Sequence, residues 1–383
     1  MTSMEQTIAA PPLASTSRTS EAKQYTRTKL MLGVGSSLLS FVVVLAIVLS
    51  GLSKEFASWA QELADNEYVS VLLFLLAVGA TESVATLPLS FYSGYIIEHR
   101  YGLSNQTVGR WVGERTKALL VAAPLMAIIS VVLYFCLKNY GMLWWLPVAV
   151  VVTLVSVVLA RIVPTLIIPL FYRFTPVKDG SLKERVTALC KSAQVRFEGI
   201  FSFDMSKNTK KANAVFTGIG KAKRIILGDT LLHSFTEDEI VTVFAHELGH
   251  YVHKHLLIGM VVGVVSTFAG LFAAAHAYAF SVSLLHFNGL TDIAALPLLG
   301  VWLSLFGLIS SPLGNMLSRK HEREADRYAV QTTGTKAAFI SALRKLAETN
   351  LADPEPHPLV EFFFYSHPSI ARRVAMVDSL NGR

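Results

Sequence analysis

Six long apolar segments constrain the fold of this 383-residue chain more than any other feature of its sequence. A helix needs about 20 mostly apolar residues to cross the hydrocarbon core of a bilayer. Each segment reaches that length, so we predict six transmembrane helices, over residues 30–52, 69–92, 118–137, 144–171, 256–285 and 294–313. The chain is therefore expected to be mainly α, a multi-pass transmembrane helix bundle embedded in a lipid bilayer.

The composition supports a membrane protein and excludes other classes. Hydrophobic residues make up 52% of the chain and charged residues only 16%, against about 25% charged in soluble domains. The two cysteines, Cys136 in an apolar segment and Cys190 in a polar one, predict neither a disulfide framework nor a cysteine-ligated zinc. The net charge of +7 comes from basic residues beside the apolar segments, as orientation signals do, so we expect no nucleic acid partner.

The distribution of basic residues predicts the orientation and the domains. Residues 1–26, rich in Ser, Thr, Ala and Pro, are predicted to be a disordered tail. Basic residues are enriched in this tail and in 93–117 but not in the loops 53–68 and 286–293, and positive-inside counting then places the tail, 93–117 and both polar blocks, 173–255 and 315–383, on the cytoplasmic side. We therefore expect an N-terminal membrane domain over 27–172 with four spans and a second domain over 173–383 that contains the last two, at about 256–285 and 294–313. We expect the membrane to be a bacterial inner membrane or the endoplasmic reticulum membrane.

The polar blocks show both helical and strand patterns. Helices are predicted over 182–193, 236–255 and 369–381, with two more within 317–350. Apolar or β-branched runs at 199–205 and 224–227 predict short strands. The cytoplasmic part is therefore expected to be a small α+β domain.

The pattern H-E-x-x-H occurs at His246, Glu247 and His250. Histidines four residues apart lie on one face of a helix, about one turn from each other, where one metal ion can bind both rings. The glutamate is then placed to act as a general base on a water molecule, as in zinc proteases. The alternative is a helix whose histidines are surface residues or hydrogen-bonded core residues.

The residues before this pattern predict a well-started helix. Thr236 followed three residues later by Glu239 is typical of a capping box, and the acidic residues 237–239 suit the positive end of the helix dipole. The apolar residues Ile240, Val243 and Phe244 then recur at helical spacing. The histidines are therefore expected on a helix, which favours the metal site.

A third metal ligand is needed, because catalytic zinc usually takes three protein ligands and a water. The charged run 318–326 follows the last apolar segment on the same predicted side of the membrane. Its Glu322 and Asp326 are four residues apart and share a helical face. One carboxylate could bind the metal and the other could accept a hydrogen bond from a ligating histidine, although a solvated charged face fits the same pattern.

The two motifs H-E-L-G-H and S-R-x-x-E-x-x-A-D together resemble the type I CAAX prenyl endopeptidases. The similarity covers roughly residues 70–380 in the family's order. It includes Leu87-Pro88 with Phe91-Tyr92, Ile97-Glu98, Tyr101-Gly102-Leu103, Thr107, Ile168-Pro169-Leu170-Phe171, Phe174-Thr175-Pro176, Asn213-Ala214 with Gly218, Arg224-Ile225, and His367-Pro368-Ser369 with Arg373.

This resemblance implies an integral-membrane zinc metalloendopeptidase whose tilted spans surround a water-filled chamber. It implies one Zn²⁺ per chain and a peptide or protein substrate, prenylated at a C-terminal CAAX motif, that loses its last three residues. Carried to the matching positions, it assigns zinc binding to His246, His250 and Glu322, general base catalysis to Glu247, support of a ligating histidine to Asp326, oxyanion stabilisation to His367 and Arg373, and substrate binding to Asn213, Ala214 and Gly218.

Several of these positions also fit plainer roles. Asn213 suits a turn, and His367 suits a helix start before Pro368. Glu82 and Arg161, which lie within apolar segments, either face the chamber or extend to the membrane surface. Four other histidines are interpreted as surface or structural residues, namely His253, His255, His321 and His357.

The sequence departs from the family pattern in two places, and other functions stay open. The family usually has seven spans and six are counted here, and Arg323 stands where an aromatic residue is common. A membrane quality-control metalloprotease that acts on non-prenylated membrane proteins is the main alternative. A zinc-binding membrane protein without protease activity, such as a transporter or scaffold, is another. An intramembrane site-2-type protease is disfavoured by the polar residues 236–239 before the motif.

Overall fold

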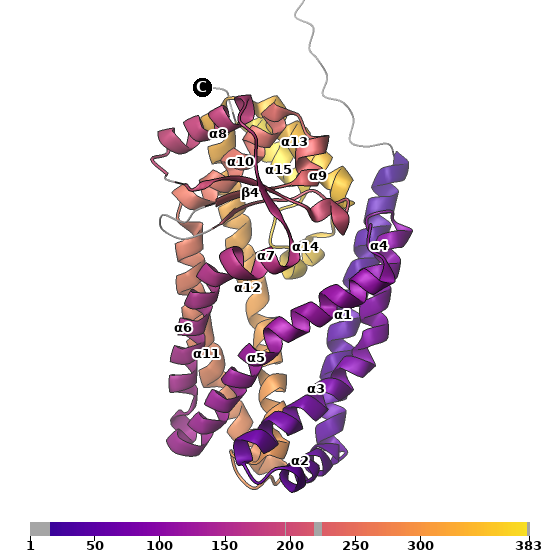
Figure 1. Cartoon of the computed structure of the whole chain (residues 1–383), viewed down its shortest axis with the longest axis vertical. Coiled ribbons are helices and arrows are strands. Elements are labelled where there is room, and N and C mark those ends of the chain that lie inside the picture. The colour runs from indigo at the N-terminus through magenta and orange to yellow at the C-terminus, as the bar shows by residue number, and fades with distance from the viewer. Residues whose placement is uncertain (1–15, 196, 218–223, 381–383) are drawn as a thin grey trace, which may run out of the picture.

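The structure, a computed structural model, describes residues 16–195, 197–217 and 224–380. Long helices run along the length of the molecule, and a smaller domain of short helices and one sheet caps one end (Figure 1). Both polar blocks of the sequence lie in this cap, so the prediction that they meet at one end of the spans agrees with the fold.

The described residues contain six helices long and apolar enough to cross a membrane, which confirms the six predicted spans. They are longer than predicted, because they extend beyond the apolar segments. α3 continues through a π-helical turn, η1 (Tyr92–Ile96), into α4 (Ile97–Arg100), and α6 continues through η3 (Val163–Ile167) into α7 (Ile168–Phe171). The spans are built on α1 (Thr16–Leu49), α3 (Glu67–Phe91), α5 (Val108–Tyr140), α6 (Trp145–Ile162), α11 (His255–Leu284) and α12 (Leu296–Thr333).

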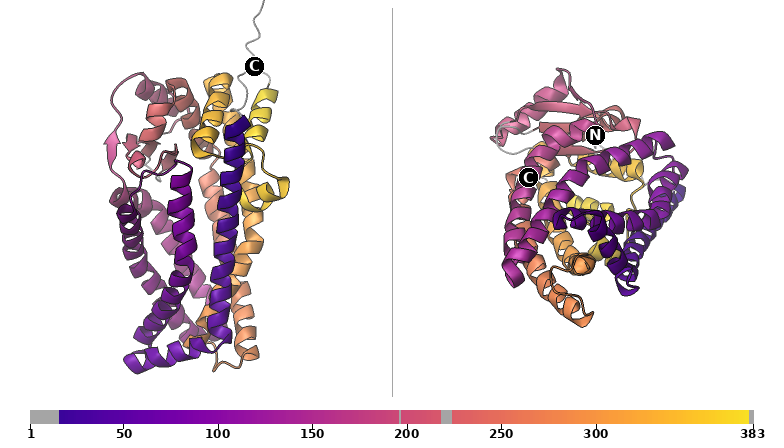
Figure 2. Two further views of the ribbon diagram at one scale, coloured as in Figure 1. Left: turned by 90° about the vertical axis from the view of Figure 1, so that its right-hand side faces the viewer. Right: turned by 60° about the horizontal axis from the view of Figure 1, so that its bottom comes forward.

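The spans are packed against one another mainly at the end far from the cap. A buried apolar cluster there includes Phe74, Trp144 and Tyr278, and the short helix α2 (Leu52–Leu63) closes it. Elsewhere the helices spread into a tilted ring (Figure 2), and five of the six spans have at most 22% of their apolar window buried. Apolar surface of this extent suits contact with lipid. Glu82 on α3 accepts a hydrogen bond from Ser40 on α1 at 2.8 Å.

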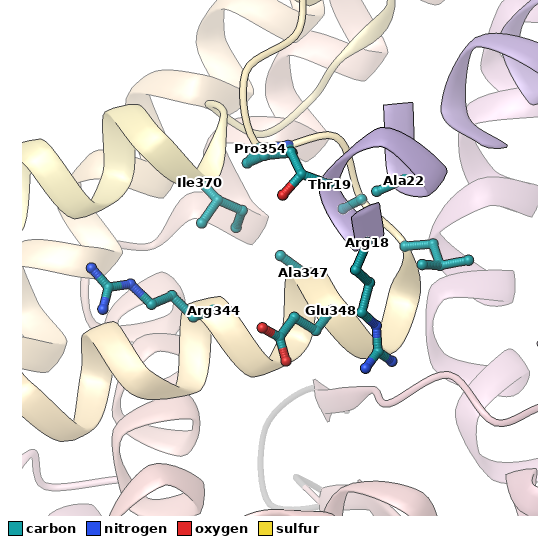
Figure 3. Close-up of a pocket in the computed structure, with 10 residues that line it drawn as sticks. Arg18, Thr19, Ala22, Arg344, Ala347, Glu348, Pro354 and Ile370 are labelled. Atoms are coloured by element: carbon teal, nitrogen blue, oxygen red, sulfur yellow. The ribbon is translucent and has the colours of Figure 1, made fainter. Parts of the chain in front are cut away.

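The start of α1 corrects one prediction. Residues 16–26 were expected in a disordered tail, but α1 is helical from Thr16. Ala22 and Tyr25 are buried against residues of the 97–103 segment and the end of α13, and the Tyr25 hydroxyl donates to Glu98 at 2.7 Å. Figure 3 shows this end of α1 beside α13, where a small cavity of about 30 Å³ remains. Tertiary packing therefore orders a segment whose composition alone favours disorder, while residues 1–15 lie outside the described residues.

A four-stranded sheet forms one layer of the cap. Its order is β1-β2-β4-β3, with β2 and β4 parallel and both outer pairs antiparallel. The strands predicted from apolar runs are the two central ones, β2 (Gly199–Phe203) and β4 (Arg224–Gly228). The outer strands are β1 (Phe174–Pro176) and β3 (Ala214–Thr217), which are too short to show a period.

The helices of the cap are α8 (Ser181–Ser192), α9 (Asp229–Ser234), α10 (Glu237–Val252), α13 (Lys336–Asn350), α14 (Pro358–Phe364) and α15 (Ile370–Ser379). The predicted helix 236–255 ends earlier than expected. Lys254 adopts a left-handed conformation, with φ of 58°, and separates α10 from α11. The last span and the charged run form one continuous helix, α12, although Pro312 lies inside it. A proline is tolerated within membrane helices, because local adjustments satisfy the one carbonyl that it frees.

Candidate metal centre

α10 carries the H-E-x-x-H pattern and forms as predicted from its first residues. Thr236 and Glu239 make a reciprocal capping box. The Glu239 carboxylate also accepts hydrogen bonds from Ser341 at 2.6 Å and Lys345 at 2.7 Å, both on α13. Burial alone would raise the pKa of Glu239, but these hydrogen bonds outweigh burial and lower it. The start of α10 is therefore anchored to α13 through an ionised carboxylate.

The structure brings His246, His250 and Glu322 together at one point between α10 and α12. The two Nε2 atoms lie 3.2 Å apart, Glu322 Oε1 lies 3.2 Å from His250 Nε2, and Glu322 Oε2 lies 3.4 Å from His246 Nε2. Donors about 2.0–2.1 Å from one tetrahedral zinc are separated by roughly 3.3 Å. The observed separations match that spacing.

The surroundings of Glu322 also fit a bound cation. Its side chain is 4% exposed, and its Oε2 makes no hydrogen bond of good geometry within the described part of the chain, although His367 Nδ1 lies 2.8 Å away. A buried carboxylate oxygen without a good donor is costly. A divalent ion shared with the two imidazoles would remove that cost, so the residues present fit a metal.

His246 is held from behind by a buried ion pair. Its Nδ1 lies 2.8 Å from Asp326 Oδ1, and Asp326 is completely buried. Arg373 grips the same carboxylate with two atoms, Nη2 at 2.5 Å and Nε at 2.8 Å. Burial alone would lower the pKa of His246, but hydrogen bonds to Asp326 and Glu322 raise it to about 9. Because Asp326 occupies Nδ1, the other nitrogen of this ring points to the metal position.

His250 is held from behind by a neutral group instead of a carboxylate. Its Nδ1 lies 2.9 Å from His255 Nδ1, and His255 Nε2 lies 2.9 Å from Glu324 Oε2. The sequence predicts a surface or structural role for His255, but its side chain is 5% exposed and contacts a predicted ligand. The contact depends on the sharp turn at Lys254, for which no sequence signal was recognised.

Close packing at Gly249 sets the distance between the two ligand-bearing helices. A Cβ atom there would lie 3.0 Å from Ala325 Cα and 3.2 Å from Tyr328 Cβ. Only glycine permits this approach without displacing α12. The small residues inside the two motifs therefore bring Glu322 within reach of the histidines.

His367 and Arg373 flank the predicted ligands but differ in their surroundings. His367 lies in the loop between α14 and α15 with 59% of its side chain exposed. Arg373 has 10% of its side chain exposed, and two of its guanidinium nitrogens are bonded to Asp326. His367 is therefore the freer of the two to donate to a bound ligand.

Arg319, one turn before Glu322 on α12, positions the loop that carries His367. It is 8% exposed and its Nη1 donates to three carbonyl oxygens, those of Glu361 at 2.9 Å, Phe362 at 3.4 Å and Tyr365 at 2.6 Å. These carbonyls lie at the end of α14, where the last carbonyls of a helix lack the usual intrahelical partners, although that of Glu361 also accepts from Tyr365 N at 3.2 Å. The arginine of the S-R-x-x-E motif, for which the sequence pattern predicts no role, therefore connects that loop to the helix of Glu322.

A cleft with a volume of about 350 Å³ opens beside these groups. Glu247 and His367 line it next to the predicted ligands, and apolar residues of α10 and α13 such as Val243 and Phe339 line another part. Within the described residues, the Glu247 carboxylate makes no hydrogen bond or ion pair. Asn213 and Ala214, at the start of β3, form part of the cleft wall, and Gly218 lies outside the described residues.

β3 is an outer strand of the sheet, so among the described residues one of its edges has no paired strand. The Asn213 carbonyl accepts from Gly228 N at 2.8 Å, which fixes the start of the strand against β4. An extended peptide can add to such an edge. The cleft therefore presents a strand edge, a metal position and a free carboxylate along one path.

Six helices able to span a membrane carry a cap in which an H-E-x-x-H helix meets a third acidic ligand. This combination defines the class of integral-membrane metalloproteases. Family comparison then places the chain within that class. The model for peptidase family M48 matches residues 176–381, and a model described as CAAX prenyl protease N-terminal, five membrane helices, matches residues 9–173. The chain belongs to peptidase family M48.

Individual relatives extend over most of the chain. It is 31% identical over 357 residues to the uncharacterized metalloprotease YhfN of Bacillus subtilis, covering 92% of this chain and 84% of that protein. It is 31% identical over 331 residues to CAAX prenyl protease 1 of Saccharomyces cerevisiae, covering 80% and 72%. The crystal structure of S. mikatae Ste24p superposes with a TM-score of 0.86 at 26% identity, covering 97% of this chain and 92% of that one.

The number of membrane helices differs from the family description. The matching N-terminal model is described as having five membrane helices, whereas the described residues up to Phe171 contain four helices long enough to cross a bilayer. The short amphipathic helix α2 lies between the first two. The described part of this region, residues 16–171, thus keeps the family's fold with four long helices.

Proposed function

We propose that the chain is a zinc-dependent endopeptidase in which His246, His250 and Glu322 hold the metal and Glu247 is the general base. The observation that carries this proposal is the convergence of three residues, because the two imidazole Nε2 atoms and the two Glu322 carboxylate oxygens lie at spacings of 3.2–3.4 Å. Exposed acidic groups gather on many protein surfaces, but Glu322 is buried and its oxygen lacks a good donor. A transporter or scaffold with the same ligands would not need a free carboxylate in the adjoining cleft.

Each residue around the cleft has a distinct task in peptide hydrolysis. Bound zinc would supply Lewis acidity at the scissile carbonyl. Glu247 takes a proton from the attacking water and returns it to the leaving amine. His367 donates to the oxygen on which negative charge develops, a contribution often worth about 3 kcal/mol.

Arg373, expected to act beside His367, takes a different part in this proposal. Both of its closest contacts are to Asp326, at 2.5 and 2.8 Å. Its charge keeps Asp326 ionised and in place, and Asp326 in turn orients His246. We therefore assign Arg373 mainly to positioning and leave His367 as the donor that reaches the cleft.

The substrate binds as an added strand along β3 in this proposal. Asn213, Ala214 and the residues that follow offer backbone groups, and the backbone pairing is indifferent to substrate sequence. Apolar side chains of the cleft wall, including Val243 and Phe339, then give the preference. This arrangement suits a short C-terminal peptide with aliphatic residues.

The proposed natural substrate is a prenylated CAAX protein that loses its C-terminal tripeptide. Support comes from the relatives of Saccharomyces cerevisiae and Homo sapiens, which are named CAAX prenyl protease 1 and its homolog and cover 80% and 86% of this chain. The proposal includes a lipid-accommodating chamber within the ring of spans. The alternative is quality control of non-prenylated membrane proteins, for which YhfN, named only as a metalloprotease, leaves room.

One assay separates these functions. The purified protein in detergent and its Glu247→Gln variant are compared on a farnesylated CAAX peptide and on its unfarnesylated twin. Cleavage of the lipidated peptide alone, lost in the variant, supports the proposal. Equal cleavage of both supports quality control, and a protein that retains zinc but cleaves neither contradicts the peptidase assignment.

The proposed cytoplasmic location of the catalytic domain, 173–383, needs its own test. Cys136 and Cys190 are buried, so single cysteines at exposed positions can report sidedness. Lys178→Cys in the cap and Asn288→Cys at the opposite end are labelled in intact cells with an impermeant maleimide. Labelling at 288 but not 178 supports the proposed orientation, and the reverse pattern contradicts it.

A further inference from the structure

His250 needs a specific proton arrangement in order to bind metal. Its Nε2 faces the metal position, 3.2 Å from both His246 Nε2 and Glu322 Oε1, so this nitrogen must carry the free lone pair. The ring proton then sits on Nδ1 and requires an acceptor. The atom found there is His255 Nδ1, at 2.9 Å.

His255 can accept that proton in only one tautomer. If its Nδ1 is bare, its own proton is on Nε2, where Glu324 Oε2 lies 2.9 Å away. In the opposite tautomer His255 would donate to His250, and His250 would carry its proton on Nε2, toward the metal. The carboxylate of Glu324, which can only accept, selects the first arrangement.

The backbone and the neighbouring rings hold His255 in this position. The left-handed residue Lys254 turns the chain so that His255 at the start of α11 points back toward α10. The His255 ring stacks on His321 of α12, with centroids 4.0 Å apart and planes 7° from parallel. His321 and Glu324 lie on either side of Glu322 along α12, so the same turn of helix supplies a metal ligand and both contacts of His255.

We propose that His255, oriented by Glu324, is a positioning residue that fixes the ring and tautomer of His250 for metal binding. This inference rests on the proposed metal site. In this proposal His255 orients the ring of His250, as Asp326 orients the ring of His246 on the other side of the site. The hydrogen-bonded series His250–His255–Glu324, called the relay below, ends in a carboxylate. The Glu324 side chain is 33% exposed, and Lys320 Nζ lies 3.9 Å from its second oxygen.

Metal affinity tests this relay without requiring turnover. In the Glu247→Gln background, Zn²⁺ affinity is measured by chelator competition, and Co²⁺ substitution reports ligand geometry through its visible absorption bands. His255→Phe keeps a ring to stack on His321 but removes the acceptor, so Zn²⁺ affinity is expected to fall by about 10–100-fold and the Co²⁺ bands to shift. Glu324→Leu is expected to lower affinity by about tenfold, because water can partly replace it.

Two further variants separate positioning from a general structural effect. His255→Asn restores an acceptor oxygen near the position of Nδ1 and is expected to recover part of the affinity. His253→Phe changes a second ring near His255, with ring centroids 5.6 Å apart, and is expected to bind Zn²⁺ as the parent does. Circular dichroism and thermal unfolding of the metal-free proteins confirm that each variant folds.

The outcomes are distinct. A His255→Phe protein with parental affinity and an unshifted Co²⁺ spectrum overturns the inference, as does an equal loss in His253→Phe. If His255→Phe does not fold, parental affinity in both His255→Asn and Glu324→Leu, with an unshifted Co²⁺ spectrum in Glu324→Leu, overturns it. If the Glu247→Gln parent itself holds no metal, the proposed function fails, and the relay fails only as a consequence.

Discussion

The two histidines proposed to bind metal are supported differently on the two sides of the site. On the α15 side, His246 contacts a completely buried Asp326, which is held in turn by Arg373. On the α11 side, His250 contacts His255 and then Glu324, whose side chain is 33% exposed. A buried ion pair cannot lose one partner without leaving the other charge unpaired, whereas a partly exposed group can exchange its partner for water. Substitutions on the α15 side should therefore weaken metal binding strongly, whereas substitutions on the α11 side should weaken it less.

The largest expected effect comes from removing the carboxylate that supports His246 on the α15 side. Asp326→Asn removes the charge that holds both His246 and Arg373, so Zn²⁺ affinity in the Glu247→Gln background should fall by about 100-fold. This loss should exceed the loss in Glu324→Leu by roughly tenfold, and chelator competition measures both. Asp353→Asn, which alters another acid lining the cleft, serves as the control and should leave affinity unchanged. Equal losses in Asp326→Asn and Glu324→Leu would remove the contrast between the two sides.

A second change extends the comparison to the loop of His367. Arg319→Leu removes the donor shared by three carbonyl oxygens at the end of α14, so the loop keeps fewer contacts with α12, among them the bond from Asn315 to the Phe363 carbonyl. We expect kcat/KM for peptide cleavage to fall by about tenfold or more, because a 1 Å misplacement of a catalytic group can cost about 100-fold. Zinc content should persist, unlike in Asp326→Asn, and Arg319→Lys should recover part of the activity. Arg323→Leu, on an exposed position of α12, is the matched control; an equal loss there, or loss of zinc in Arg319→Leu, contradicts the prediction.

A third change tests the contact that both sides share. Gly249→Ala places a methyl group 3.0 Å from Ala325 Cα, so α10 and α12 must separate. Overpacking of this kind costs about 1–3 kcal/mol, and thermal unfolding in detergent should show lower stability together with weaker zinc retention. Gly263→Ala on α11, where an added Cβ has no atom within 4 Å, should not destabilise the protein. Unchanged zinc affinity in Gly249→Ala would mean that the helix spacing is not critical.

The smallest effect concerns the far end of α10 and depends on pH. The pKa of Glu239 is lowered in the folded protein. Its ionised form therefore stabilises the fold above the unfolded-state pKa of about 4.3, and this contribution is lost as pH falls through the lower folded-state pKa. Glu239→Gln should reduce the free energy of unfolding by about 1 kcal/mol at pH 7, and the difference from the parent should shrink below about pH 4. Glu237→Gln, which alters a 34% exposed ion pair, should change little; a constant difference across pH would contradict the assignment.

Sequence reasoning recovered what depends on local pattern. The six spans follow from apolar length, and the start of α10 follows from Thr236 and Glu239, because both signals lie within a few turns of one helix. The pairing of Glu322 with Asp326 on one face also follows from spacing. What the residues alone left open was which of these carboxylates meets which histidine nitrogen.

Long-range packing explains what was missed. The order of residues 16–26 depends on contacts with residues more than 70 positions away, as between Tyr25 and Glu98. The role of His255 depends on a left-handed residue at 254 and on a carboxylate 69 positions later. Likewise, the hydrogen bond from Arg373 to Asp326 depends on the packing of α15 against α12. A local sequence pattern does not predict such packing.

α12 is one continuous helix that contains both the last membrane span and the predicted metal ligand Glu322. Its 38 residues make a rod about 57 Å long, and a tilt of about 1° moves the far end of such a rod by about 1 Å. Metal–ligand bonds tolerate only about 0.2 Å, so independent motion of this rod would dismantle the coordination set. The close contact of Gly249 with Ala325 couples α10 to α12. A thicker or thinner bilayer can therefore tilt both helices together while the donor atoms of His246, His250 and Glu322 keep their mutual spacing.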